Sequence, residues 1–131
     1  MILISYEVKN SAVHGTGIFT KERIKKGSLI AKASPMLDLN IPPSVFETLE
    51  KREKDEILYW GYYDKRSGNY HVDFDNTKFI NHSKDGNVTW DPAHQDMHLI
   101  AKRDIDIGEE LTQNYLEFES IEELQKRGIS Q

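Results

Sequence analysis

An abrupt polar corner interrupts the middle of the sequence. The apolar pair Phe79-Ile80 runs directly into Asn81, His82 and Ser83, and a Lys-Asp-Gly-Asn stretch follows. Because Asn, Ser, Asp and Gly all favour turns, the simplest interpretation is a surface turn. An amide, an imidazole and a hydroxyl placed directly after a buried segment could also form a binding site. A site at this corner needs support from other parts of the chain.

A second candidate for chemistry is a pair of glycines near the N-terminus, Gly15 and Gly17, which flank Thr16. Glycine allows backbone amides to approach an anionic group closely, because no Cβ stands in the way. The pattern predicts either a simple turn at the end of a strand or a cradle for a carboxylate. Taken alone, the turn is the better interpretation.

Cysteine and metal chemistry have little support in the sequence. The chain has no cysteine, which excludes disulfides, thiolate zinc sites and a cysteine nucleophile. His94 and His98 have the spacing of metal ligands on a helix, but Pro92 and the strand-like residues 98–100 oppose a helix there, so a solvated loop is favoured. Ser83 lacks the nucleophile-elbow context of a hydrolase. We therefore expect no metal site.

The composition limits the classes of protein to which the chain can belong. The 131 residues suit one domain with a real core, and the net charge of −5 argues against a general nucleic-acid binder, which would carry a basic face. No apolar stretch approaches the roughly 18–20 residues of a membrane span, and the N-terminus lacks the features of a signal peptide. We expect a soluble intracellular protein, in the cytoplasm or in the nucleus of a host, that contacts neither nucleic acid nor membrane directly.

Hydrophobic periodicity predicts the elements that must position these residues. Four segments have the pattern of strands or of strand pairs, namely residues 2–8, 20–30, 70–74 and 101–111. The second and the fourth share one design, in which a glycine closes a turn between two strands. The only convincing helix covers residues 42–60, with proline at its start, and residues 121–127 are compatible with a short second one. The fold class is therefore mainly β, a single domain over residues 1–131 with one inserted helix.

Four short motifs follow one another along the chain at domain-scale spacing. They are Gly-Thr-Gly at 15–17, Tyr-His-Val-Asp at 70–73, Phe-Ile-Asn-His-Ser at 79–83 with Asn87, and Gly-Glu-Glu-Leu-Thr-Gln-Asn-Tyr at 108–115. Each motif is weak alone, but their order and spacing resemble the SET domain, the protein-lysine methyltransferase fold that uses S-adenosylmethionine. The resemblance covers about residues 5–115, and the small size is similar to stand-alone viral and bacterial members.

The resemblance implies small twisted sheets with a knot-like threading of the C-terminal segment, an arrangement that most folds avoid. It also implies a variable insert at residues 38–66 that carries the helix, and a tail at residues 116–131 that closes the cofactor side where many relatives have zinc-binding cysteines. The implied cofactor is S-adenosylmethionine. The residues matched to its binding are Gly15, Thr16, Gly17, Asn81, His82, Tyr115 and Phe118.

The resemblance further implies that Tyr115 and Tyr70 are the catalytic tyrosines, with Tyr70 lining the lysine channel. Only a neutral amine has the lone pair for methyl transfer, and deprotonating a lysine of pKa about 10.4 at pH 7 costs about 4–5 kcal/mol. A dry aromatic channel lowers this cost, and a tyrosine hydroxyl can orient the amine. The residues expected to bind substrate are Tyr62, Tyr63, Tyr70 and Gln113. Gln113 stands where many relatives have the Phe or Tyr that sets the number of methyl groups, so product multiplicity stays open.

Two functions remain open at the level of the sequence. The resemblance implies methyl transfer to a lysine of a protein substrate, such as a histone tail or another basic protein, and the acidic net charge is compatible with such a partner. The alternative is a SET-like module that binds a peptide without catalysis. Tyr115 argues against this alternative, because a pure reader has no need of that residue. A homodimer is left open.

Overall fold

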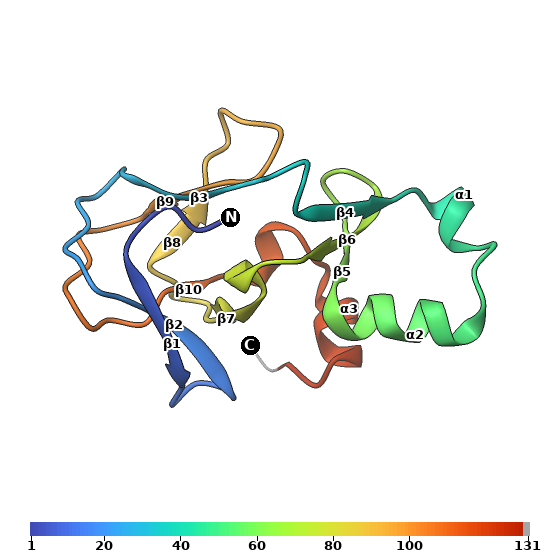
Figure 1. The fold of residues 1–131 in the computed structure, drawn as a ribbon, viewed down its shortest axis with the longest axis horizontal. Coiled ribbons are helices and arrows are strands. Elements are labelled where there is room, and N and C mark those ends of the chain that lie inside the picture. Colours follow the sequence, from blue (N-terminus) through green and yellow to red (C-terminus); the bar gives the residue numbers. More distant parts are fainter. Residues whose placement is uncertain (130–131) are drawn as a thin grey trace.

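Short strands are the most frequent regular elements among residues 1–129, and the helices gather toward one end (Figure 1). The computed structural model describes residues 1–129. The strands are β1 (Tyr6–Asn10), β2 (Thr16–Thr20), β3 (Leu29–Lys32), β4 (Asp38–Ile41), β5 (Tyr62–Asp64), β6 (Asn69–Asp73), β7 (Asn81–His82), β8 (Val88–Trp90), β9 (His98–Ala101) and β10 (Thr112–Gln113). The helices are α1 (Pro43–Phe46), α2 (Lys51–Trp60) and α3 (Ile121–Lys126), with 3₁₀ turns η1 (Asn76–Phe79) and η2 (Tyr115–Glu117). None of the helices within residues 1–129 combines the length and the hydrophobicity needed to cross a membrane.

The strands form small separate sheets, as expected for the mainly β class. β1 and β2 make a hairpin, and β4, β6 and β5 pair antiparallel in that order. The largest sheet has the order β3-β9-β8-β10-β7, and within it β10 runs parallel to both of its neighbours. β10 comes last in the chain yet lies between two strands that are close in sequence. The C-terminal segment must therefore pass between β7 and β8.

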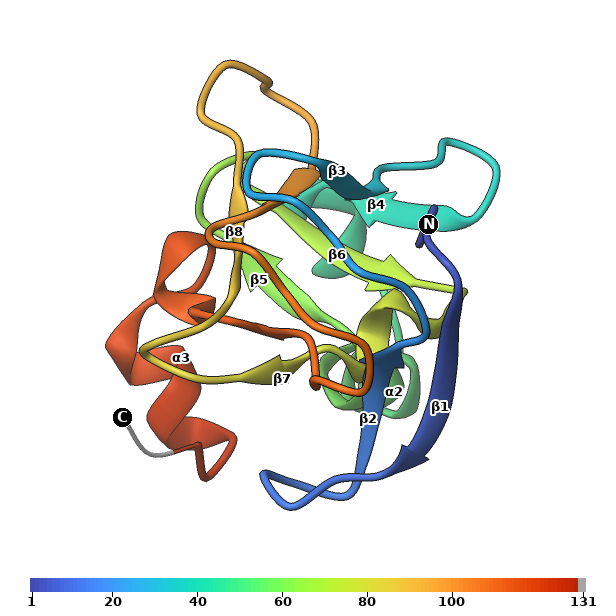
Figure 2. The same ribbon diagram turned by 90° about the vertical axis from the view of Figure 1, so that its left-hand side faces the viewer.

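The orange C-terminal segment runs beside β7 (Figure 2). Gly86 marks the point where this segment passes through. It belongs to the loop at residues 83–87 that joins β7 to β8, and a Cβ at this position would lie 2.6 Å from the carbonyl oxygen of Thr112. The side chain of Asn87 holds the passing segment, since its Nδ2 donates to the Glu110 carbonyl at 2.8 Å and its Oδ1 accepts from the Thr112 N–H at 2.9 Å. Glycine is needed for such a close crossing. The predicted knot-like threading is confirmed.

The two copies of the strand–turn–strand design pair with each other. Ile24 and Ile105, which occupy the same place in each copy, exchange backbone hydrogen bonds of 2.9 and 2.8 Å. Each turn glycine, Gly27 or Gly108, donates its N–H at 2.8 Å to the first residue of the other copy. Both glycines have left-handed backbones, with φ of +86° and +89°. The repeat seen in the sequence is thus one turn used twice about a local pseudo-twofold axis.

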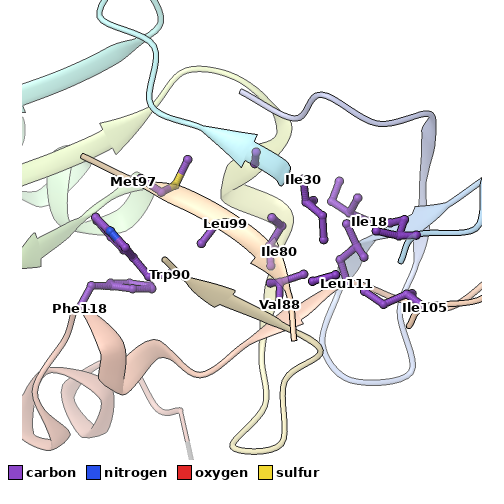
Figure 3. Close-up of a cluster of buried hydrophobic side chains, with 13 residues drawn as sticks. Ile18, Ile30, Ile80, Val88, Trp90, Met97, Leu99, Ile105, Leu111 and Phe118 are labelled. Carbon is purple, nitrogen blue, oxygen red and sulfur yellow. The ribbon is translucent and has the colours of Figure 1, made fainter. Parts of the chain in front are cut away.

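The main core lies where the largest sheet meets the β1–β2 hairpin (Figure 3). Ile18, Ile30, Leu99 and Leu111 are 0% exposed. Burying an aliphatic side chain of this size contributes about 1.5–3 kcal/mol, so this cluster holds the hairpin against the sheet. Trp90 and Phe118 extend the same cluster toward the C-terminal segment. The core therefore supports the elements that carry the polar corner and the C-terminal motif.

Two predicted elements differ in extent from their sequence patterns. The helix expected over residues 42–60 is split into α1 and α2, because Glu50 caps a new helix in the middle of the segment. The Glu50 side chain accepts from the Glu53 N–H, and Glu53 Oε1 accepts from the Glu50 N–H at 3.0 Å. The strand expected over residues 2–8 begins only at Tyr6. The short helix at the C-terminal end is confirmed as α3.

Strand β6 points its polar residues inward, although the alternation of apolar and polar residues predicts that the apolar ones point inward. His71 and Asp73 are buried, whereas Phe74, directly after the strand, is 77% exposed. His71 Nε2 lies 2.8 Å from Asp73 Oδ1, and its Nδ1 lies 2.7 Å from Asn40 Oδ1. Burial acts to lower the pKa of His71, but the hydrogen bond and the charge of Asp73 outweigh it and raise the pKa. These hydrogen bonds compensate the burial of polar groups that the hydrophobic pattern could not anticipate.

Candidate functional site

The polar corner at residues 81–83 begins with a buried side chain rather than a surface turn. Asn81 is 8% exposed. Its Nδ2 donates to the carbonyl oxygens of His14 and Thr16, at 2.9 and 3.1 Å. The same nitrogen donates to Glu110 Oε1 at 2.8 Å. Asn81 thereby fixes the Gly-Thr-Gly turn and ties it to the C-terminal motif.

The two glycines of that turn are needed for different reasons. Gly15 has φ +46°, in the left-handed region that favours glycine, and nothing lies within 4 Å of a Cβ placed there. A Cβ at Gly17 would instead lie 2.8 Å from Glu110 Cδ and 3.1 Å from Ser11 Cβ. Ser11 Oγ donates to Glu110 at 2.7 Å. Gly17 therefore makes room for the Glu110 carboxylate.

Glu110 is a residue that the sequence reasoning missed. It lies inside the motif at 108–115, but no role was assigned to it. Its side-chain partners Asn81 and Ser11 are 29 and 99 residues away in the chain, so no local pattern indicates the contact. The turn, the corner and the C-terminal motif meet at this carboxylate.

His82 follows Asn81 and points its ring toward the C-terminal motif. Its Nδ1 accepts the Tyr115 N–H at 3.1 Å, which requires a neutral ring with the proton on Nε2. Burial lowers the pKa of His82, in agreement with a neutral ring. Nε2 is buried and has no hydrogen-bond partner among residues 1–129. It is a donor available for a ligand or a water molecule.

Tyr115 stands at the end of the C-terminal motif, in the turn η2. Its ring centroid is 5.2 Å from that of His82 and 5.2 Å from that of Phe118. Its hydroxyl donates to the Ile80 carbonyl oxygen. Burial raises the pKa of the Tyr115 phenol, so the hydroxyl stays protonated and can act as a donor or an orienting group at neutral pH.

Two hollows meet at Tyr115. The larger, here called the outer hollow, has a volume of about 620 Å³, within the usual range of small-molecule sites. It is lined by residues 13–16, 58–60, 78–79, 81–82, Tyr115 and 127–129. The smaller, here called the inner hollow, has a volume of about 50 Å³. It is lined by residues 60–62, Asp73, 77–78, Ile80, Trp90, Met97, Gln113, Tyr115, 118–119 and Arg127. Both hollows share Tyr115, Trp60, Lys78 and Arg127.

Most residues predicted to bind the cofactor lie around the outer hollow. Gly15, Thr16, Asn81, His82 and Tyr115 line it directly. The two others lie elsewhere. Gly17 packs against Glu110 beneath the turn, and Phe118 lines the inner hollow.

The three tyrosines predicted to bind substrate divide between two faces of the β4–β6–β5 sheet. Tyr62 lines the inner hollow together with Gln113, and its ring centroid is 4.5 Å from that of Phe118. Tyr63 pairs with Tyr70 across the sheet, so both lie on the opposite face from Tyr62 because neighbouring residues of a strand alternate.

Tyr70 stacks on Phe46 at a centroid distance of 3.7 Å, and neither it nor Tyr63 lines either hollow among the described residues. Of these tyrosines, Tyr62 and not Tyr70 lines the inner hollow together with Tyr115.

One group of side chains has the composition of a metal site. Ligand atoms of Asp38, His71 and Asp73 lie within 4.8 Å of one another. Both ring nitrogens of His71 already have partners in Asn40 and Asp73, and an imidazolium with raised pKa does not bind a cation. The absence of a metal remains a prediction.

Comparisons with known proteins identify what the chain is similar to. The family model of the SET domain matches residues 15–116. Among solved structures, a candidate histone methyltransferase of Plasmodium falciparum is 19% identical with a TM-score of 0.59, over 87% of this chain and 95% of that one.

A second similar structure is the Neurospora SET domain protein DIM-5, a histone lysine methyltransferase. It is 21% identical with a TM-score of 0.58, over 87% of this chain and 53% of that one. No curated protein matches the sequence. At these identities the solved structures establish the shared fold.

Proposed function

Because the chain belongs to the SET-domain family, we propose that it transfers a methyl group from S-adenosylmethionine to the side-chain amine of a lysine in a protein substrate. The observation that carries this proposal is the position of Tyr115, whose side chain borders both hollows. One hollow is large enough for a nucleoside-sized ligand, and the other is narrow and aromatic. A group between them can orient one reactant toward the other.

The outer hollow fits the proposed cofactor. Its volume of about 620 Å³ suits such a ligand, and the buried Nε2–H of His82 has no partner among residues 1–129. Gly15 leaves its backbone open to close approach, since nothing lies within 4 Å of a Cβ placed there. The cofactor would supply an electrophilic methyl group on a positively charged sulfur. Gly15, Asn81 and His82 would hold it.

The residues around the inner hollow would bind the lysine side chain and orient its amine. Tyr62, Phe118 and Tyr115 form aromatic walls around the inner hollow, which suit an alkyl chain with a cationic tip. Removing water from the amine favours its neutral form, the only form with a free lone pair. The Tyr115 hydroxyl and the Ile80 carbonyl, already hydrogen-bonded to each other, place polar atoms where the amine would be oriented.

The proposed substrate is a basic protein, with histone tails as the first candidates. The net charge of the chain is −5, which favours a lysine-rich partner electrostatically. The solved structures of similar fold are described as those of histone methyltransferases or candidates for that activity. Residues 60–62 of the insert and residues 118, 119 and 127 of the tail line the inner hollow, where a peptide would enter.

Incubation with labelled S-adenosylmethionine tests the proposal directly. Core histones and a cell lysate serve as substrates, and label on a protein band is the expected result. Binding is tested separately, because S-adenosylhomocysteine should raise the melting temperature by binding only the folded state. Asn81→Ala should lose this shift. Cofactor binding without transfer to any protein would favour the non-catalytic peptide-binding module instead.

A further inference from the structure

The buried carboxylate of Glu119 is not explained by the fold. Its side chain is 1% exposed and lines the inner hollow. Oε1 accepts a hydrogen bond of 2.5 Å from the Arg127 guanidinium. Oε2 is buried and has no partner among the described residues. A buried carboxylate oxygen without a donor is costly, which indicates that a donor is supplied from outside the chain.

The inner hollow offers the space and the surroundings for such a donor. Its volume of about 50 Å³ is enough for a water molecule or an ammonium group. Gln113 also lines this hollow, and its Nε2 is buried and without a partner among residues 1–129. Tyr62, Phe118 and Tyr115 present aromatic rings to the same space. Rings and one free carboxylate oxygen are the surroundings that an alkylammonium group prefers.

We propose that Glu119 Oε2 receives the ammonium group of the target lysine in the inner hollow and accepts the proton that the amine must lose. The inference rests on the proposed methyl transfer and adds a residue to it. Glu119 then distinguishes a charged amine from a neutral side chain of the same length. A water molecule occupies the position when no substrate is bound.

The proton step is a simple exchange between two groups. One N–H bond of the ammonium breaks, an O–H bond forms at Oε2, and the electron pair stays on nitrogen. Burial raises the pKa of the Glu119 carboxyl, and the Arg127 guanidinium opposes part of this shift. The charged and titratable groups around it are Tyr62 from β5, Asp73 from β6, Lys78 from η1, Tyr115 from η2, and Glu123 and Arg127 from α3 and its end.

Titration with n-butylammonium chloride tests the inference, because this ion is a lysine side chain without its backbone. Binding is followed by the NMR shifts of the Gln113 side-chain amide, with sodium chloride as the ionic-strength control. The uncharged comparison ligand is 1-butanol. We expect the protein to bind n-butylammonium at least tenfold more tightly than 1-butanol, because a hydrogen bond between two charged groups strengthens binding by at least that factor. Glu119→Gln should reduce this preference to less than twofold.

Glu123→Gln is the matched control, since it also removes one negative charge, but from α3 and outside the lining of the inner hollow. It should keep the preference. Equal binding of the two ligands by the unmodified protein would overturn the inference and leave only a water site. A preference for n-butylammonium that is retained in Glu119→Gln would overturn it as well. If that variant does not fold, the comparison of ligands on the unmodified protein still decides. The titration involves neither cofactor nor methyl transfer, so its failure is distinct from a failure of the proposed function.

Discussion

Replacing Gly17 by alanine should disturb the point where the turn, the corner and the C-terminal motif meet. The new Cβ would lie 2.8 Å from Glu110 Cδ and 3.1 Å from Ser11 Cβ, closer than packed carbon atoms tolerate. The Glu110 carboxylate must then move away. It would lose the hydrogen bonds from Asn81 and Ser11, at 2.8 and 2.7 Å.

The expected cost follows from those bonds. A hydrogen bond to a charged group contributes about 1.5–3 kcal/mol, so the loss of both bonds in Gly17→Ala should lower the free energy of unfolding by about 3–6 kcal/mol. In a Glu110→Ala background the clash is gone, and the cost should fall to about 1 kcal/mol because the contact with Ser11 remains. The coupling between the two substitutions is therefore about 2–5 kcal/mol.

Urea unfolding followed by tryptophan fluorescence measures the four proteins of this cycle. Gly15→Ala is the control, since it meets no atom within 4 Å and should cost about 1–2 kcal/mol from its left-handed backbone alone, with no coupling to Glu110. Additive effects of Gly17→Ala and Glu110→Ala would refute the steric argument. S-adenosylhomocysteine binding should weaken in Gly17→Ala and recover in part in the double variant.

Four further predictions concern the site and its surroundings. Tyr115→Phe keeps the ring but removes the donor to Ile80, so cofactor affinity should survive while methyl transfer falls by orders of magnitude; retained turnover would contradict the role of Tyr115. Gln113→Tyr should shift the products toward monomethyl-lysine in mass spectra, because glutamine is smaller than a ring and leaves room for a second methyl group, and a parent enzyme that makes only monomethyl product would disprove this. EDTA should change neither melting temperature nor activity, whereas a loss that zinc restores would reveal a metal site. The folded pKa of His71 is raised above 6.5, so its contribution to the stability of the protein is complete below pH 6.5 and is lost as the pH rises through the folded pKa. His71→Asn should therefore flatten this part of the curve of stability against pH in thermal unfolding. An unchanged curve would argue against the charged ring.

The sequence by itself indicated the family and singled out the polar corner at residues 81–83 as a candidate site. Hydrophobic periodicity predicted the mainly β class, and the resemblance carried by the four motifs implied the threading that β10 makes between β7 and β8. The repeated glycine turn was visible because Gly27 and Gly108 each need a positive φ at a fixed place in a short pattern. Such features are local, since backbone conformation and hydrophobic period act over a few residues.

The tertiary structure alone decided which side chains reach the two hollows. Strand alternation shows that Tyr62 and Tyr63 face opposite ways, but only the pairing with β6 shows that Tyr62 lies toward the inner hollow and Tyr70 away from it. Glu110 and Glu119 carry ordinary surface residue types in the sequence. Glu119 is buried and Glu110 is partly buried, because their partners arrive from elsewhere in the fold, Ser11 from 99 residues away and Arg127 from the end of the following helix. The burial of a charge depends on such partners, and no hydrophobic period or local motif encodes them.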